Sequence, residues 1–224
     1  MNRPLPTAIV GRGFAQGQIF DYTRGTMDMA LDAFFDVSDE ALLVLYANGD
    51  AGGARMLTVR MVPRILGYAT RLLSDRAEAE DVAQEAMLRL WRAAPDWRQG
   101  EAKVTTWLYR VTTNLCTDRL RVRQRRKLSA LDDAPDVEDS ARGAEAGMME
   151  TDRMAALNNA LAALPGRQRE AVVLRHIEGL TNPEIAAVMD IGIEAVESLI
   201  ARGKRGLTAI LAGRRDDLGY EEGI

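Results

Sequence analysis

The chain has 224 residues, 47% of them apolar and 28% charged, with a net charge of −4. That is the composition of an ordinary folded protein with one or two domains. One cysteine, Cys116, excludes an internal disulfide framework and fits a reducing cytosol. One histidine, His176, leaves too few ligands for a Cys/His zinc site. We therefore expect no metal, no cofactor and no small-molecule substrate, and no stretch is apolar for long enough to insert into a membrane.

The charge is distributed unevenly along the chain. Residues 101–127 carry eight Lys or Arg and two acids, a net charge of +6. Residues 128–152 carry eight acids and one Arg, a net charge of −7. This contrast indicates a local binding site for a polyanion next to a separate acidic tether.

The pattern of apolar residues predicts an all-α fold with two helical domains. Apolar positions recur at spacings of three and four, and strand-like alternation is absent. Turns are predicted at 50–53 and 94–96, where Gly or Pro interrupts the pattern. The predicted organisation is a disordered leader (1–36), a first helical domain (37–127), a flexible acidic linker (128–151), a second helical domain (152–212) and a tail (213–224).

In the first domain, the helix predicted over 78–91 has two distinct faces. Its apolar stripe consists of Val82, Ala86, Met87 and Leu90. Another face carries the carboxylates of Glu78, Asp81 and Glu85 at spacings of three and four, with Gln84 beside them. Such a face can bind a basic partner, or it can simply be a solvated acidic surface.

The helix predicted over 104–127 is the basic part of the chain. Its apolar stripe is Val104, Leu108, Val111 and Leu115, and another side carries Arg110, Asn114, Asp118, Arg121 and Arg125. Trp107 lies near its start, just after the loop that ends at Lys103. Cations that follow a phosphate backbone, next to an aromatic on which bases can stack, are typical of single-stranded DNA binding. The alternative is a solvated basic face with Trp107 in the core.

The second domain contains a predicted helix-turn-helix. Thr181 to Glu184 has the pattern of a capping box, and it starts a short helix over 183–189. A tight turn at 190–192 leads to a longer helix, from 193 to about 211. By itself the pattern also fits an ordinary αα-hairpin.

Three runs in this order, 75–91, 105–121 and 156–207, resemble a bacterial RNA polymerase sigma factor. The class is the short extracytoplasmic-function (group IV, sigma-70 family) type, which has only sigma regions 2 and 4. The resemblance covers about residues 38–212. It implies transcription initiation on a catalytic partner, RNA polymerase core, with no covalent chemistry of the chain's own. It also implies restraint by an anti-sigma factor and a response to stress.

The resemblance assigns roles to particular residues. Asp81, Gln84 and Glu85 would dock on the clamp helices of the polymerase β′ subunit. Lys103, Trp107, Arg110, Asn114 and Arg121 would open and bind the −10 element. Ser198, Arg202, Lys204 and Arg205 would face the −35 duplex, while the same domain touches the β flap.

The sequence departs from the family pattern in the helix-turn-helix. Glu194, Glu197 and Leu199 stand where basic residues are frequent, and Asp190 stands in the turn where glycine is frequent. Aspartate tolerates a left-handed backbone, so the turn is expected to form. Cys116 is expected to be a buried small apolar side chain, and His176 to lie on a helix surface near the C-terminal end of its helix.

Two other functions remain open from the residues. A stand-alone helix-turn-helix regulator would bind duplex DNA without polymerase. An anti-sigma or adaptor protein would bind polymerase without DNA, which the +6 segment and Trp107 disfavour.

Overall fold

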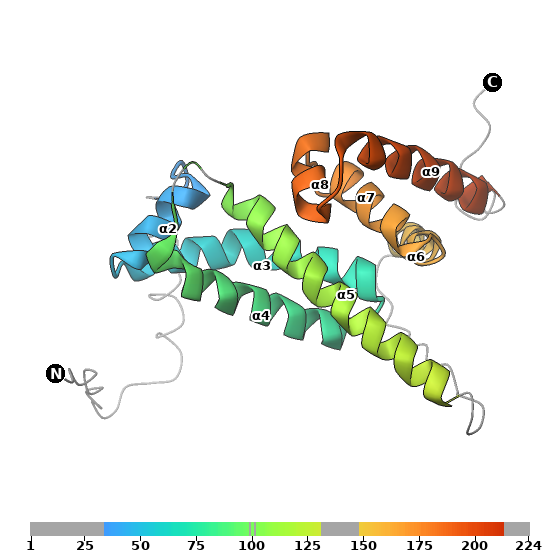
Figure 1. Ribbon diagram of the computed structural model, residues 1–224, viewed down its shortest axis with the longest axis horizontal. Coiled ribbons are helices and arrows are strands. Elements are labelled where there is room, and N and C mark those ends of the chain that lie inside the picture. The colour runs from blue at the N-terminus through green and yellow to red at the C-terminus, as the bar shows by residue number, and fades with distance from the viewer. Residues whose placement is uncertain (1–33, 99, 101, 131–147, 213–224) are drawn as a thin grey trace. The chain divides into compact units, whose positions relative to one another are not determined.

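The computed structural model describes residues 34–98, 100, 102–130 and 148–212 (Figure 1). Within these ranges the regular elements are all helices, as the periodicity predicts. The N-terminal helices are α2 (Asp39–Ala47), α3 (Ala51–Leu73), α4 (Arg76–Ala93), the 3-10 helix η1 (Ala94–Asp96) and α5 (Val104–Ala130). The C-terminal helices are α6 (Met148–Ala162), α7 (Gly166–His176), α8 (Asn182–Met189) and α9 (Ile193–Ala212). Among the described residues, no helix is both long and apolar enough to cross a membrane.

Two of the predicted boundaries differ from the structure. Because α5 continues to Ala130 and α6 already begins at Met148, helices enter both ends of the predicted linker. Its middle, residues 131–147, lies outside the described residues, as do residues 1–33 of the predicted leader and residues 213–224, the predicted tail.

The predicted turn at 50–53 is instead the start of a helix. Asp50 caps α3, since its Oδ1 accepts a hydrogen bond from Gly52 N at 2.7 Å. Gly53 then lies against α2 so closely that a Cβ there would be 2.5 Å from Leu42 O. The glycines therefore permit close packing of α2 on α3 rather than a chain reversal.

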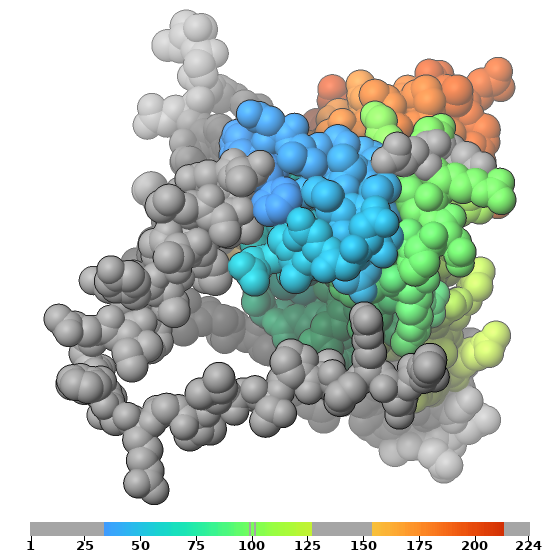
Figure 2. Space-filling model, turned by 90° about the vertical axis from the view of Figure 1, so that its left-hand side faces the viewer, coloured from blue at the N-terminus to red at the C-terminus, as the bar shows by residue number. Residues whose placement is uncertain are grey.

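The first helices form one core around α3. Leu42 and Leu43 of α2, and Leu57 and Ile65 of α3, are almost completely buried. Glu40 joins α2 to α5, because its Oε1 accepts a hydrogen bond from Val104 N at 3.0 Å. Figure 2 shows α2 and the first half of α3 (blue to cyan) on one face, with the start of α5 (bright green) beside them. This contact fixes the start of α5, where the predicted −10 residues begin.

The buried side of α5 is rotated from the predicted stripe. Val104 and Leu108 are buried as expected, but Val111 and Leu115 are only half-buried, whereas Thr112 and Thr113 are buried. Thr112 Oγ1 donates to Leu108 O at 2.8 Å within the same helix. Thr113 Oγ1 shares a 2.7 Å hydrogen bond with Tyr68 OH of α3. Both hydroxyls are thus satisfied inside the core, which a count of apolar residues cannot foresee.

In the C-terminal part, α7 and α9 approach each other very closely. A Cβ on Gly203 of α9 would be 2.5 Å from Val172 Cγ2 and 3.1 Å from Gln168 O of α7. Val196 of α9 and Val173 and Leu174 of α7 are buried in the same region. Gly203 therefore allows this side of α9 to pack directly on α7, and the opposite side of α9 faces outward.

The described residues from Ser38 onward belong to one compact unit. Its larger core cluster combines residues of α3 and α5, such as Tyr68 and Tyr109, with residues of α7, α8 and α9, such as Val172, Ile185 and Val196. The C-terminal helices therefore pack on α3 and α5 of the N-terminal helices.

Candidate nucleic-acid interface

The acidic face of α4 forms on a well-capped helix. Ser74, in a left-handed conformation, ends α3, and Asp75 caps α4 by accepting a hydrogen bond from Glu78 N at 3.0 Å. Asp81 and Gln84 are exposed and Glu85 is half-buried. Their spacing of three and four brings them together on one side of the helix.

Neighbouring arginines neutralise part of this acidic face. Glu85 Oε1 accepts from Arg89 Nε at 2.8 Å, and this hydrogen bond lowers the pKa of Glu85. Asp81 lies 3.5 Å from Arg119 Nη1 of α5, and Glu78 lies 3.4 Å from Arg123 Nη2. Glu78 and Asp81 are therefore both paired with arginines of α5, and Glu85 with an arginine of its own helix, whereas Gln84 is exposed and Asp81 keeps 69% of its side chain exposed.

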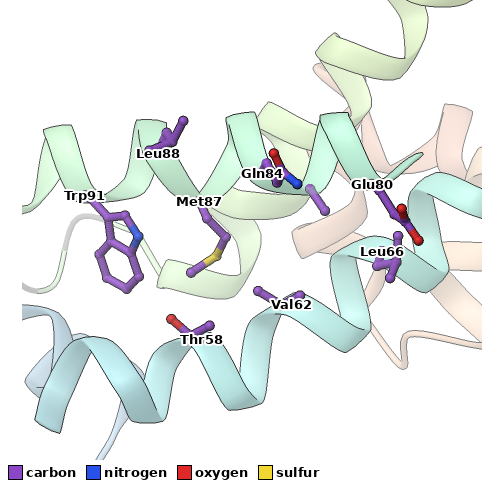
Figure 3. Close-up of a pocket in the computed structure, with 9 residues that line it drawn as sticks. Thr58, Val62, Leu66, Glu80, Gln84, Met87, Leu88 and Trp91 are labelled. Carbon is purple, nitrogen blue, oxygen red and sulfur yellow. The ribbon is translucent and has the colours of Figure 1, made fainter. Parts of the chain in front are cut away.

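A groove between α3 and α4, of about 400 Å³, adjoins the acidic face. Its lining is Thr58, Val62, Leu66, Glu80, Ala83, Gln84, Met87, Leu88 and Trp91. In Figure 3, Met87 and Trp91 extend from α4 toward Thr58 and Val62 of α3. Leu88 is 49% exposed, a large apolar side chain beside Gln84 at the rim. The sequence prediction missed this groove, although an apolar residue four positions after Gln84 was a signal for it.

The predicted −10 residues form one stripe along α5. Trp107, Arg110, Asn114 and Arg121 follow one another at spacings of three, four and seven, which keeps them on one side of a helix. Lys103 precedes the first turn on the same side, and these side chains are exposed except for Trp107. Trp107 is half-buried, with an edge-to-face contact to Trp97 at 5.9 Å between ring centroids. Trp107 is therefore neither a fully buried core residue nor a fully exposed one, and its −10 role stays a prediction.

Cys116 and His176 lie where the sequence predicted. Cys116 is 1% exposed, and burial raises the pKa of its thiol to about 12. His176, in the last turn of α7, is exposed. Among the described residues, no three His, Cys, Asp or Glu side chains gather in a way that could hold a metal ion.

The helix-turn-helix has the predicted local geometry. Thr181 N donates to Glu184 Oε2 at 2.8 Å, so the capping box is present. Asp190 ends α8 with φ of 54°, a left-handed residue as expected. The turn then leads into α9 at Ile193.

The predicted −35 residues of α9 divide into two groups. Ser198, Arg202 and Arg205 are exposed and recur at four and three, so they share one side of the helix. Lys204 is exposed too, but it stands two positions after Arg202 and therefore points to another side. Glu194 lies on the same side as Ser198, four positions earlier. The stripe thus carries two cations and one carboxylate, and the structure does not bring Lys204 to it.

Residues at the start of α5 are in contact with carboxylates of α8 and of the segments that flank it. Lys103 Nζ lies 2.7 Å from Glu184 Oε1, and Arg110 Nη2 lies 3.9 Å from Asp190 Oδ1. Tyr109 OH donates to Glu178 Oε2, and burial raises the pKa of this phenol, helped by the carboxylate. The hydrogen bond from Lys103, followed by those from Thr181, lowers the pKa of Glu184 to about 2. The sequence prediction missed these contacts, since partners about 70 to 80 positions apart leave no periodic signal.

Comparison with known proteins agrees with this arrangement. Residues 57–126 match the family model "Sigma-70 region 2", and residues 154–207 match "Sigma-70, region 4". The chain is 32% identical over 181 residues to the RNA polymerase sigma-H factor of Pseudomonas aeruginosa, covering 77% of this chain and 93% of that relative. The chain belongs to the extracytoplasmic-function (ECF) class of the sigma-70 family.

This ECF sigma factor has further relatives in sequence and fold. It is 35% identical over 150 residues to the ECF RNA polymerase sigma factor SigE of Mycolicibacterium smegmatis, covering 66% of this chain and 58% of that one. Its fold matches the sigma factor RpoE from Bartonella quintana, crystallised with the anti-sigma factor NepR. That match has a TM-score of 0.60 and 22% identity, and covers 70% of this chain and 96% of the other. Hereafter region 2 denotes the helices α2–α5, and region 4 the helices α6–α9.

Proposed function

We propose that this sigma factor brings RNA polymerase core to promoters by three separate surfaces. The observation that carries the proposal is the stripe on α5, where cations and a half-exposed tryptophan stand in line. A helix of this kind can hold the phosphates of a single strand and stack an unpaired base. Family membership favours this function over a stand-alone regulator.

The polymerase-binding surface is the face of α4 with Asp81, Gln84 and Glu85, next to the groove between α3 and α4. Charged residues at its rim would steer a basic partner helix, and Leu88 and Trp91 would give it apolar contact. The β′ clamp helices are the partner that the family implies.

The −10 surface is the stripe of Lys103, Trp107, Arg110, Asn114 and Arg121. Strand opening by binding needs a pocket or platform that holds an unstacked base, which offsets a few kcal/mol of lost stacking. Trp107 supplies the aromatic surface and the cations hold the backbone. The chain contributes binding energy here and makes or breaks no covalent bond.

The −35 surface is the side of α9 with Ser198, Arg202 and Arg205, inserted into the major groove. Glu194 on the same side repels phosphate and can accept from a cytosine amino group, so the preferred −35 sequence should include a cytosine near it. Lys204, off this side, would contact the flanking backbone or the β flap.

An anti-sigma factor is the proposed regulator. The fold neighbour from Bartonella quintana was crystallised with one. The apolar groove beside the acidic face offers such a protein a site that overlaps the polymerase-binding surface. Both partners would then compete for α4, in the cytoplasm where polymerase works.

Run-off transcription tests the proposal. Purified core polymerase is incubated with fragmented genomic DNA, with and without the full chain, and the new transcripts are sequenced. We expect transcripts from a small promoter set that shares −10 and −35 elements. Tight, sequence-specific duplex binding by the chain alone, with no new transcripts, would contradict the proposal and favour a stand-alone regulator.

A further inference from the structure

The two helices of the helix-turn-helix are joined by a side-chain contact that the sequence prediction did not include. Asn182, the first residue of α8, donates from Nδ2 to Glu197 Oε1 of α9 at 3.3 Å. Glu197 is exposed, whereas Asn182 is half-buried. The carboxylate of Glu197 therefore stands at the surface of the helix-turn-helix with one of its two oxygens bound to α8.

Asn182 is fixed at the start of α8. The residue before it, Thr181, donates from N and from Oγ1 to Glu184 Oε2, at 2.8 and 2.7 Å. The amide oxygen of Asn182, Oδ1, is buried and has no hydrogen-bond partner among the described residues. A buried unpaired acceptor costs free energy, so a specific interaction must hold the amide in this orientation. The carboxylate of Glu197 does so, because it only accepts hydrogen bonds and therefore attracts Nδ2 and repels Oδ1.

Glu197 lies beside the proposed −35 surface. Successive residues of a helix are about 100° apart, so Glu197 stands on the side of α9 next to that of Ser198. Both residues are exposed, in contrast to Gly203, which is buried against α7. A helix about 10–12 Å across fills a major groove about 12 Å wide, so both of these sides would meet DNA when α9 enters the groove.

An oriented carboxylate can select one base in the major groove. Asn182 engages Oε1 of Glu197, so Oε2 is the oxygen left to accept a hydrogen bond from a base. In that groove only cytosine N4 and adenine N6 donate, and adenine places the acceptor N7 beside N6, where it repels a carboxylate. Guanine and thymine offer acceptors but no donor there. Cytosine is therefore the base that fits this carboxylate.

We propose that Glu197 is a specificity-determining residue of the −35 surface that selects a cytosine through its N4 amino group, and that Asn182 is the positioning residue that aims the carboxylate. This inference rests on the proposed −35 role of α9 and adds two residues to that surface. Glu194 stands one turn earlier on the same helix, and the hydrogen bond from α8 distinguishes Glu197 from it.

Selection of promoter DNA by holoenzyme tests the proposal. The probe is a duplex promoter found by run-off transcription, with its −35 element randomised, and the bound molecules are sequenced. Salt concentration is held constant, because it changes the affinity of every sequence. We expect wild type to favour cytosine over thymine at one position by at least about fivefold, the lower end of what one wrong base pair costs.

Two single variants should remove this preference. In Glu197→Gln, Asn182 Nδ2 binds the new amide oxygen, so the amide NH2 group faces the base and repels cytosine N4. In Asn182→Asp, the side chain keeps its shape but repels Glu197, and α8 should stay folded because an acid in the first turn suits a helix N-terminus. We expect the cytosine preference to disappear in both. The matched control, Glu194→Gln, removes the same charge one turn earlier and should leave the preference at this position unchanged.

The double variant, Asn182→Asp with Glu197→Gln, exchanges the acid and the amide and conserves the net charge. The carboxylate at position 182 then accepts from the NH2 group at position 197, and the amide oxygen at position 197 faces the base again. We expect the exchange to restore the preference for cytosine. Recovery of each variant with core polymerase shows that it is folded.

Two results would overturn the proposal. One is the same −35 preference in wild type and in both single variants, and the other is a double variant that does not regain the preference for cytosine. If wild-type holoenzyme selects a −35 element that these variants leave unchanged, only this inference is wrong. If wild-type holoenzyme selects no −35 element, the proposed −35 role of α9 is wrong as well.

Discussion

The two helices proposed to meet promoter DNA, α5 and α9, present their cations differently. At the start of α5, Lys103, which directly precedes the helix, and Arg110 face carboxylates of region 4. On α9, Arg202 Nε donates to Ser198 O of its own helix, and the side chain is exposed. Two cations of the proposed −10 surface are thus paired with carboxylates of region 4, whereas Arg202 of the proposed −35 surface bonds only within its own helix in the contacts described.

This difference gives promoter recognition an order. On the proposed surfaces, duplex contact by α9 would meet exposed cations, whereas strand capture by α5 would compete with the carboxylates paired to Lys103 and Arg110. A net charge of −4 further opposes binding of the free chain to DNA. Polymerase would therefore convert a weak DNA binder into a specific one.

Removing the polymerase-binding face should abolish the action of both helices. We expect Asp81→Arg with Glu85→Arg to eliminate core polymerase from a pull-down, because the face would then repel a basic partner. Folding should survive, since exposed substitutions usually change stability by about 0.5 kcal/mol. The control is Asp96→Arg with Asp118→Arg, two exposed acids elsewhere in region 2. Equal core recovery from both variants would refute the assignment.

Glu170 of α7 should make the packing of region 4 depend on pH. It is 5% exposed, Oε1 has no hydrogen-bond partner among the described residues, and burial raises its pKa to about 7. Arg167 lies nearby, and its positive charge opposes this rise in the pKa of Glu170. The negative charge of Glu170 in turn raises the pKa of Tyr68 and of Cys116 in region 2.

A raised pKa in the folded state means that Glu170 costs stability as pH rises from about 4.5 through 7. At 1.36 kcal/mol per pKa unit, this loss is about 3 kcal/mol relative to Glu170→Gln. Urea unfolding of both proteins at pH 5 and pH 8 measures it. An identical pH dependence in wild type and variant would show that the carboxyl is not buried in solution.

Trp107→Ala should slow strand opening without preventing duplex binding. Stacking of a base on an aromatic is worth about 1–3 kcal/mol, so opening should slow by roughly one or two orders of magnitude. A template with a mismatched bubble over the −10 element should rescue most of the loss. Because Trp107 also packs on Trp97, thermal unfolding must first show that the variant is folded. Equal defects on closed and bubble templates would assign Trp107 a purely structural role.

The smallest expected effect distinguishes two cations of α9. Arg202→Ala should weaken promoter binding by holoenzyme by about tenfold, in line with about 1–3 kcal/mol for a base contact, and a bubble should not rescue it. Lys204→Ala, off the stripe, should lower affinity uniformly for all sequences and reduce its salt dependence. Filter binding at two salt concentrations measures both. If Lys204→Ala changes the preferred sequence and Arg202→Ala does not, the orientation assigned to α9 is wrong.

Local signals were enough to predict most of the fold. Capping residues and breakers fixed the starts of α8 and α9, and apolar spacing fixed the buried side of α4. The wrong predictions concern polar residues whose side chain forms a hydrogen bond with one specific partner. Thr113 is buried on α5 because Tyr68, 45 positions earlier, bonds to its hydroxyl. Asp50 looked like a turn residue because a capping side chain and a turn side chain use the same short-range hydrogen bond.

The sequence predicted the candidate surfaces as stripes along helices, but it did not predict the ion pairs that their side chains make. The spacing along α5 placed Arg110, Asn114 and Arg121 together correctly on one side. The contacts of Lys103 and Arg110 with region 4 depend on tertiary packing between segments far apart in sequence. Lys204 was grouped with Arg202 through the family resemblance, although helical geometry separates them.

Asp190 shows how one position can serve two selective demands. Glycine adopts a φ of 54° with less strain, but it has no carboxylate to place near Arg110. A mutation to glycine would therefore ease the turn and release a cation of the −10 surface at once. Among related chains, the residue at this turn should vary together with the residue at 110: where an acid is lost, the paired arginine loses one reason to be retained.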